Sequence, residues 1–385
     1  MDYVDNFLPY FTGDGSVGLF SEEFDDIYHS SYGALSEAYE KFADAIPNIS
    51  KQNLRVLDIC YGLGYNTKAF LNQNFNKNIM IDCLDIDKNL LLLSPFIKTN
   101  FTLMDTIYSK IFPNYGKENL PKKINKKIKS YISKSRNNEK YIINDKINHL
   151  LIKNLYEQFG EESLKDNLAT KKKFIRYFNK NAVNFMKFYI KNRYKFTKNK
   201  NKSTFLHNIY YRYLSKRYKY LFNNNIKFNF YIDDARNTVK NLNKKYDYIF
   251  LDAFTTDKCP QLWSQDFINN LYKLLNTDGA LVTYSCSVIV RSTMRGAGFY
   301  VGKIINKNNK VIGTICSKNN NLINNKLNNY EIGLMNTKAG IPYRDVNLDA
   351  DKDTILKLRD EEIKNSSLLS SSKYIKKYKE KLYEI

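Results

Sequence analysis

The chain has 385 residues, 43 % of them hydrophobic, and a formal net charge of +22. That length can bury a substantial core, and no stretch approaches the roughly 18 consecutive apolar residues of a membrane span or resembles a signal peptide. The five cysteines are scattered without a C-x-x-C pair and the three histidines are far apart. These patterns argue against a metal site or a disulfide framework and predict a cytoplasmic protein without a membrane partner.

Short apolar runs ending on acids alternate with helical stretches along the chain. The first run covers residues 54–58 and is followed by a glycine turn and a helix at 67–75. Further strands are expected at 79–87, 226–236, 246–254 and 279–287, the last entered through a turn at 276–279, with a hairpin at 298–304 and 310–317 that residues 330–336 could join. Strands alternating with helices predict an α/β fold, a Rossmann-like, seven-stranded, mostly parallel sheet.

The positive charge is concentrated between the second and third predicted strands. Residues 116–226 hold 28 basic and 7 acidic residues, whereas the remaining chain holds 33 basic and 32 acidic ones. Aromatic residues at helical spacing predict an inserted basic helical subdomain over 106–226, whose charge predicts a polyanionic partner, either nucleic acid or an acidic membrane face. The other expected parts are an N-terminal hairpin and helical segment (1–53), a catalytic core (54–105 and 227–350) and a C-terminal helical tail (351–385).

Acids and glycines at the predicted strand ends form the motif of a nucleotide-type cofactor. Gly62 and Gly64 lie in a turn that lets backbone N–H groups approach a ligand, and Asp85 ends the second strand, where an acid typically holds ribose hydroxyls. Asp58 precedes the turn, and Asp234-Ala235 follow the third strand, where an adenine amino group can be read. The missing third glycine of the dinucleotide fingerprint makes S-adenosyl-L-methionine the favoured cofactor.

The end of the fourth strand carries the candidate catalytic group. Asp252 follows the apolar run 248–251, and in this fold it is expected beside the methyl group of the cofactor. A carboxylate there can hydrogen-bond an attacking amine, accept its proton and stabilise the developing cation. The nearby ring of Phe254 can wall the pocket or stack on a base.

Several segments resemble the methyltransferase component of the MnmC family, which modifies the wobble uridine of tRNA. They include "LDICYGLGYNT", "DDARNTV", "YDYIFLDAFTTDKCPQLWSQDF", "LVTYSCSVIVRSTMRGAGFYVGK" and "IPYRDVNLDADKDTILKLRDEE". The resemblance implies that S-adenosylmethionine methylates the primary amine of 5-aminomethyl-uridine in tRNA. It implies that Asp252 is the catalytic carboxylate. The residues it implies for the substrate side are Tyr28, Ser30, Glu37, Phe254, Lys258, Trp263 and Arg291, of which Trp263 fits a core position equally well.

Some features depart from the family pattern. Many relatives carry glycine where this chain has Cys60, the turn Thr255-Thr256-Asp257 replaces a turn with proline, and the basic insertion is unaccounted for. Many relatives also carry a flavin-dependent oxidase behind this domain, which is not expected here, so a separate enzyme is expected to supply the aminomethyl-uridine. Two alternatives stay open: a polyamine aminopropyltransferase-like enzyme, and a non-catalytic RNA-binding protein that retains the fold.

Overall fold

The structure is a computed structural model that describes residues 7–12, 16–21, 26–28, 33–74, 77–87, 90 and 226–383. The predicted helical insertion therefore lies outside the described residues, apart from its last residue. The chain divides into two compact units. The first comprises residues 1–39, 61–81 and 87–232, and the second comprises residues 40–60, 82–86 and 233–385.

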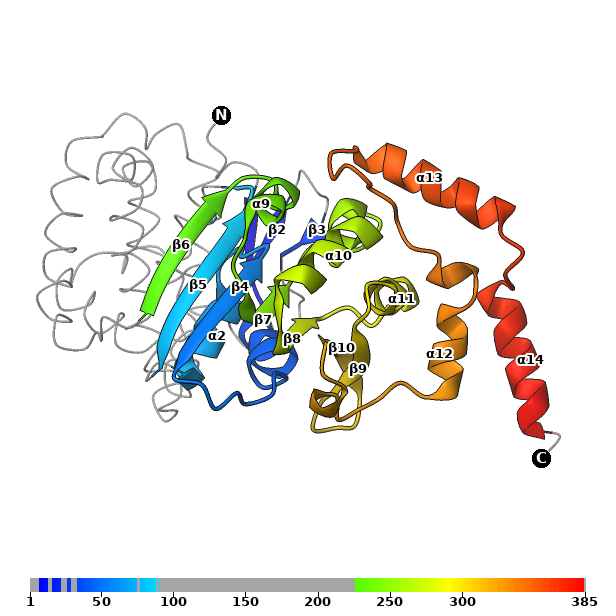
Figure 1. The fold of residues 1–385 in the computed structure, drawn as a ribbon, viewed down its shortest axis with the longest axis horizontal. Coiled ribbons are helices and arrows are strands. Elements are labelled where there is room, and N and C mark those ends of the chain that lie inside the picture. The colour runs from blue at the N-terminus through cyan, green and yellow to red at the C-terminus, as the bar shows by residue number, and fades with distance from the viewer. Residues whose placement is uncertain are drawn as a thin grey trace, which may run out of the picture. The chain divides into compact units, whose positions relative to one another are not determined.

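The structure contains a seven-stranded, mostly parallel sheet (Figure 1), which confirms the predicted fold class. Its strands follow the order β6-β5-β4-β7-β8-β10-β9. The bounds are β4 (Asn53–Ile59), β5 (Asn78–Asp85), β6 (Ile226–Ile232), β7 (Tyr246–Leu251), β8 (Leu275–Thr283), β9 (Tyr300–Ile305) and β10 (Val311–Ser317).

The middle strands of this sheet are buried and in fixed register. Strand β4 pairs in parallel with β7, which places Asp58 opposite Phe250, and β7 pairs in parallel with β8. All six residues of β7 are buried, as expected for a central strand of a parallel sheet that is covered on both faces. The predicted hairpin of β9 and β10 is confirmed, β10 pairs antiparallel with β8, and β9 is the edge strand.

The second unit also holds most of the helices. Their bounds are η2 (Ala38–Ala43, π-helical, shared with the first unit), α9 (Ala235–Asn241), the 3-10 helix η4 (Pro260–Trp263), α10 (Gln265–Leu274), α11 (Val288–Gly296), η5 (Asn320–Leu322), α12 (Asn329–Met335), η6 (Lys338–Gly340), α13 (Lys352–Asn365) and α14 (Ser371–Tyr383). Side-chain caps start several of them: Ser264 accepts the N–H of Phe267, and Ser287 accepts the N–H of Val290. These caps satisfy helix N–H groups that would otherwise lack partners.

Two sequence expectations for the second unit are wrong in detail. Residues 329–335 do not join the hairpin but form α12, because Asn328 and Glu331 make a reciprocal capping box at its start. The predicted turn at 276–279 lies within β8 as an irregularity in its pairing with β7. A Cβ at Gly279 would lie 2.9 Å from the carbonyl oxygen of Asp247, so this close approach requires glycine.

The described part of the first unit contains a small antiparallel sheet and two helices. The sheet order is β1-β2-β3, with β1 at Phe7–Phe11, β2 at Val17–Ser21 and β3 at Asp26–Ile27. The helices are α1 (Ala34–Glu37) and α2 (Tyr65–Asn74). Helix α2 follows the glycine turn directly, and Ala69, Phe70 and Leu71 are fully buried, so apolar packing holds its position.

Candidate active site

Three strand ends of the second unit bring carboxylates to one edge of the sheet. Asp58 is fully buried near the end of β4, and Asp85, which is 8 % exposed, ends β5. Asp252 follows β7, and its backbone N–H donates to the carbonyl oxygen of Ile59 at 3.2 Å. This bond extends the pairing of β4 and β7 by one step, so Asp252 stays fixed beside the end of β4.

The thiol of Cys60 lies within electrostatic reach of these three carboxylates. Burial raises the pKa of this thiol well above its ordinary value, and Cys259 and the charges of Asp85, Asp252 and Asp58 raise it further. Three carboxylates within electrostatic reach of one side chain create a negative potential at this edge of the sheet. Such a potential suits a cationic ligand, such as a sulfonium or an ammonium group.

Cys60 also has an unusual backbone conformation. Its φ of 61° lies in the left-handed region, where a residue other than glycine is strained by about 1 kcal/mol or more. Gly62 and Gly64, two and four residues further on, also have positive φ values of 55° and 75°. The segment C-Y-G-L-G therefore holds three positive-φ residues within five positions, a conformation that glycine adopts without strain.

The glycine turn itself belongs to the first unit and is held by short-range contacts. The N–H of Gly64 donates to the carbonyl oxygen of Tyr61 at 2.8 Å, and the ammonium of Lys68 donates to the carbonyl oxygen of Leu63 at 3.0 Å. Lys68 is fully buried in α2, and burial lowers its pKa to about 7. The sequence did not predict that Lys68 would be buried with its ammonium on the glycine turn.

Two aromatic side chains brace the loop that follows Asp252. The indole N–H of Trp263 donates to the carbonyl oxygen of Phe254 at 2.8 Å, and the hydroxyl of Tyr284 donates to the carbonyl oxygen of Ala253 at 2.9 Å. The rings of Trp263 and Tyr284 meet edge to face, with centroids 6.3 Å apart. Trp263 is 1 % exposed. It is therefore a core residue that fixes this loop, which was one of its two predicted readings.

The role of Tyr284 was not predicted from the sequence, although its position indicates it. It follows β8 directly, and the aromatic ring at a strand end could have been read in the same way as Phe254. The ammonium of Lys41 lies 5.8 Å from the centre of the Tyr284 ring. This contact places a cation over the ring of Tyr284.

Asp234 has a different environment from the other predicted cofactor residues. Its carboxylate caps α9 by accepting the N–H of Arg236 at 2.9 Å, and it pairs with the guanidinium of the same residue at 2.7 Å. Its neighbour Ala235 begins α9 and is 9 % exposed. The side chain of Asp234 is thus oriented by protein contacts, and 30 % of it is exposed.

The predicted substrate residues lie in different surroundings. Tyr28 and Glu37 are half-buried in the first unit, and Ser30 lies outside the described residues. Phe254 and Lys258 are half-buried on the loop after β7, where the N–H of Lys258 donates to the carbonyl oxygen of Thr255 at 3.0 Å.

Arg291 is not placed as the sequence suggested. It is 7 % exposed, and its guanidinium donates to the hydroxyl of Thr314, the carbonyl oxygen of Gly313 and the carboxylate of Glu331. A guanidinium used in this way joins α11, β10 and α12 inside the protein. These contacts lie inside the protein, so the structure does not support the expected contact between Arg291 and an RNA phosphate.

The described residues contain no group of three or more His, Cys, Asp or Glu side chains that could hold a metal ion. Among the helices that the structure describes, none has the length and apolar character needed to cross a membrane.

Comparison with known proteins relates part of the chain to a methyltransferase family. Residues 197–319 match the family model Methyltransf_30, described as S-adenosyl-L-methionine-dependent methyltransferase. This match confirms the predicted cofactor. The match covers β6 to β10, including Asp234 and Asp252, so this part of the chain is similar to S-adenosylmethionine-dependent methyltransferases.

Individual relatives extend the comparison over most of the chain. The uncharacterized protein MJ0670 of Methanocaldococcus jannaschii is 26 % identical over 367 residues, which cover 94 % of this chain and 75 % of that protein. The bifunctional protein MnmC of Azoarcus sp., named for tRNA 5-methylaminomethyl-2-thiouridine biosynthesis, is 38 % identical over 73 residues, 19 % of this chain and 12 % of that protein. The crystal structure of MNMC2 from Aquifex aeolicus has a TM-score of 0.56 and 19 % identity, over 94 % of this chain and 86 % of that chain, and so shares the fold.

Proposed function

We propose that this protein transfers a methyl group from S-adenosylmethionine to the amine of 5-aminomethyl-uridine at the wobble position of tRNA. The observation that carries the proposal is the position of Asp252. Its backbone N–H donates to the carbonyl oxygen at the end of β4. Its charge, together with those of Asp85 and Asp58, raises the pKa of the Cys60 thiol. The local similarity to an MnmC protein supports the choice of substrate.

The residues present suit the cofactor. Asp85 at the end of β5 is expected to hold the ribose hydroxyls, and Asp58 with Gly62 and Gly64 is expected to hold the amino-acid part, as the sequence order predicts. The positive φ values of Gly62 and Gly64 are typical of a turn in which the backbone can approach a ligand closely. When bound, the cofactor supplies a methyl group on a positively charged sulfur, which the negative edge of the sheet favours electrostatically.

Asp252 is expected to act on the amine rather than on the cofactor. The carboxylate accepts a hydrogen bond from the neutral amine and holds its lone pair in the direction of attack. As nitrogen gains a bond to carbon it becomes cationic, and the carboxylate stabilises this charge and accepts the proton that leaves. Trp263 and Tyr284 contribute by keeping the backbone of residues 253 and 254 in place.

The basic segment 106–226 is expected to contact the tRNA backbone. Residues 116–226 of this segment hold 28 basic and 7 acidic residues, the kind of charge that binds phosphates with a steep dependence on salt. The amine substrate must be made before this enzyme acts, because S-adenosylmethionine chemistry adds only the methyl group. A separate enzyme that installs the aminomethyl group is therefore part of the proposal.

A methyl-transfer assay tests the proposal directly. The full chain is mixed with S-adenosylmethionine and tRNA from cells that lack this methyltransferase, and the digested nucleosides are measured by mass spectrometry. We expect 5-aminomethyl-uridine to be converted to 5-methylaminomethyl-uridine, with or without 2-thiolation. Binding of the cofactor without conversion of any tRNA nucleoside would overturn the substrate, and parallel reactions with putrescine and the decarboxylated cofactor would then test the polyamine alternative.

A further inference from the structure

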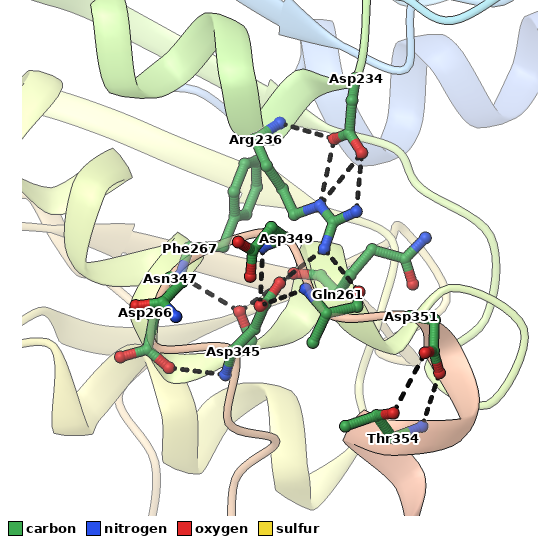
Figure 2. Close-up of polar contacts among 12 residues, drawn as sticks. Asp234, Arg236, Gln261, Asp266, Phe267, Asp345, Asn347, Asp349, Asp351 and Thr354 are labelled. Carbon is green, nitrogen blue, oxygen red and sulfur yellow. Dashed lines mark hydrogen bonds and ion pairs between the residues drawn. The ribbon is translucent and has the colours of Figure 1, made fainter.

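Arg236 is the centre of a polar network that joins two distant parts of the chain. Its guanidinium contacts the carboxylate of Asp234 through Nε and Nη2, and its Nη1 donates to Oδ2 of Asp345 at 2.7 Å and to the carbonyl oxygen of Ala350 at 2.8 Å (Figure 2). The guanidinium is largely buried, with 11 % of the Arg236 side chain exposed. All the groups in this network belong to the second unit.

Asp345 organises the segment that supplies these contacts. Its side chain is completely buried, and its Oδ1 accepts the N–H groups of Asp349 at 3.0 Å and Ala350 at 3.1 Å. Its own N–H donates to Oδ2 of Asp266 in α10 at 2.8 Å, as Figure 2 shows. The single carboxylate therefore closes the turn 345–350 and presents its second oxygen to Arg236.

The residues just before Asp345 are hydrogen-bonded to the start of α10, which follows the loop after Asp252. The N–H of Gln265 donates to the carbonyl oxygen of Tyr343 at 2.9 Å, and the ring of Tyr343 lies under the guanidinium of Arg359 at 5.0 Å. Helix α13 also packs against η4. Residues 341–350 thus connect the loop after Asp252 with the turn between β6 and α9.

The network fixes the orientation of Asp234. Its two oxygens accept the backbone N–H, Nε and Nη2 of Arg236, and a carboxylate has about four acceptor positions in all. A planar guanidinium that meets a carboxylate through two donors fixes the angle as well as the distance. Rotation of Asp234 would break these bonds, and release of Asp345 would free the guanidinium that holds it.

We propose that Asp345, acting through Arg236, is a positioning residue for the adenine end of the cofactor site. It holds the Asp234-Ala235 turn in the orientation that S-adenosylmethionine requires. The inference rests on the proposed function and on the sequence-based expectation that this turn contacts the adenine. A buried ion pair adds little net stability because desolvation offsets the attraction, so a role in fixing geometry accounts better for three charged groups at one turn.

The test is the substitution Asp345→Asn in the full chain. Asparagine keeps the shape and one acceptor oxygen for the turn, but removes the negative charge that faces Arg236. We expect the Kd for S-adenosylmethionine, measured by calorimetry, to rise roughly tenfold, which is the scale of one charge-assisted hydrogen bond. At saturating cofactor kcat should change less than about twofold, because Asp345 does not reach the methyl group.

A second ligand separates positioning of the adenine end from general damage. 5′-Methylthioadenosine contains the adenosine but lacks the amino-acid part of the cofactor. Its affinity should fall by the same factor as that of S-adenosylmethionine in Asp345→Asn. A loss confined to S-adenosylmethionine would place the defect at the other end of the cofactor and overturn the inference.

Two control variants change the same region without touching Arg236. Arg344→Gln breaks the exposed ion pair with Glu362, one residue before Asp345. Asp351→Ala removes the side chain that caps α13 by accepting the N–H of Thr354, and so lowers stability at the end of the same segment. Both should bind the cofactor as the wild type does.

The possible results separate this inference from the proposed function. Unchanged cofactor affinity in folded Asp345→Asn, or an equal loss in Asp351→Ala, would overturn the positioning role and leave the methyltransferase assignment intact. Absence of cofactor binding by the wild type would overturn both. If Asp345→Asn does not fold, Arg236→Lys provides the second variant: it keeps the charge but loses the planar fork, and the same selective loss of affinity is expected.

Discussion

The backbone N–H of Asp252 donates to the carbonyl oxygen of Ile59 at 3.2 Å. This bond connects the residue after β7 with Ile59, the last residue of β4. Cys60 is the next residue of the chain after Ile59. Two features predicted separately from the sequence, the acid after the fourth strand and the turn after the first, therefore share one edge of the sheet. This bond fixes the backbone that carries the Asp252 carboxylate.

Asp252→Asn should abolish most methyl transfer while the protein still binds its cofactor. Asparagine keeps the size of the side chain but cannot accept the proton of the amine, and loss of a general base typically costs about 10²–10⁴ in rate. The measurement is kcat with modified tRNA, together with the Kd for S-adenosylmethionine. Asp257→Asn, five residues along the same loop, is the matched control and should retain activity. Equal activity of wild type and Asp252→Asn would remove the carboxylate from the mechanism.

Tyr284→Phe should weaken the brace of the catalytic loop. The change removes the hydroxyl that donates to the carbonyl oxygen of Ala253 and leaves a buried acceptor without this donor. We expect the free energy of unfolding to fall by about 1–2 kcal/mol and kcat to fall more than the affinity for the cofactor. Urea unfolding and steady-state kinetics measure the two effects. Tyr300→Phe, at an exposed position on β9, should change neither quantity.

Cys60→Gly and Cys60→Ala should differ in stability. Both variants remove the thiol, but only glycine relieves the left-handed backbone at φ 61°. We expect Cys60→Gly to be more stable than Cys60→Ala by about 1 kcal/mol in urea unfolding. Equal stability of the two variants would show that the strain seen at this position is relieved in solution.

Lys68 should make stability depend on pH above neutrality. Burial lowers its pKa to about 7, whereas in the unfolded chain the pKa has its ordinary value of 10.5. Between these values the unfolded chain binds more protons than the folded one, so the free energy of unfolding rises with pH from about 7 to 10.5 and is lower on the acid side.

The substitution Lys68→Met should remove this contribution. Urea unfolding of wild type and Lys68→Met at pH 7 and pH 9 measures the difference between the two proteins, which cancels the titration of other groups. The wild type should gain stability relative to the variant as the pH rises. Lys310→Met, at an exposed turn, should follow the wild type. A difference that stays constant with pH would contradict the lowered pKa.

Much of the fold could be predicted from the sequence because its signals are local. The apolar run 248–251 predicts a buried strand, and β7 is buried along its whole length. Segment 330–336 was misassigned because its apolar residues suit a strand as well as a helix, and the capping box of Asn328 and Glu331 decides between them.

For the candidate site, the pattern of an acid after an apolar run already predicts the residues at the strand ends, Asp58, Asp85 and Asp252. The contacts that hold these side chains become apparent only in the folded chain. The rings of Trp263 and Tyr284 pack edge to face at one loop. Asp345 accepts a hydrogen bond from Arg236, although the two residues are 109 positions apart in the chain. The physical reason is that strand periodicity acts between neighbours in the chain, whereas side-chain hydrogen bonds and buried ion pairs depend on contacts that exist only after the sheet has formed.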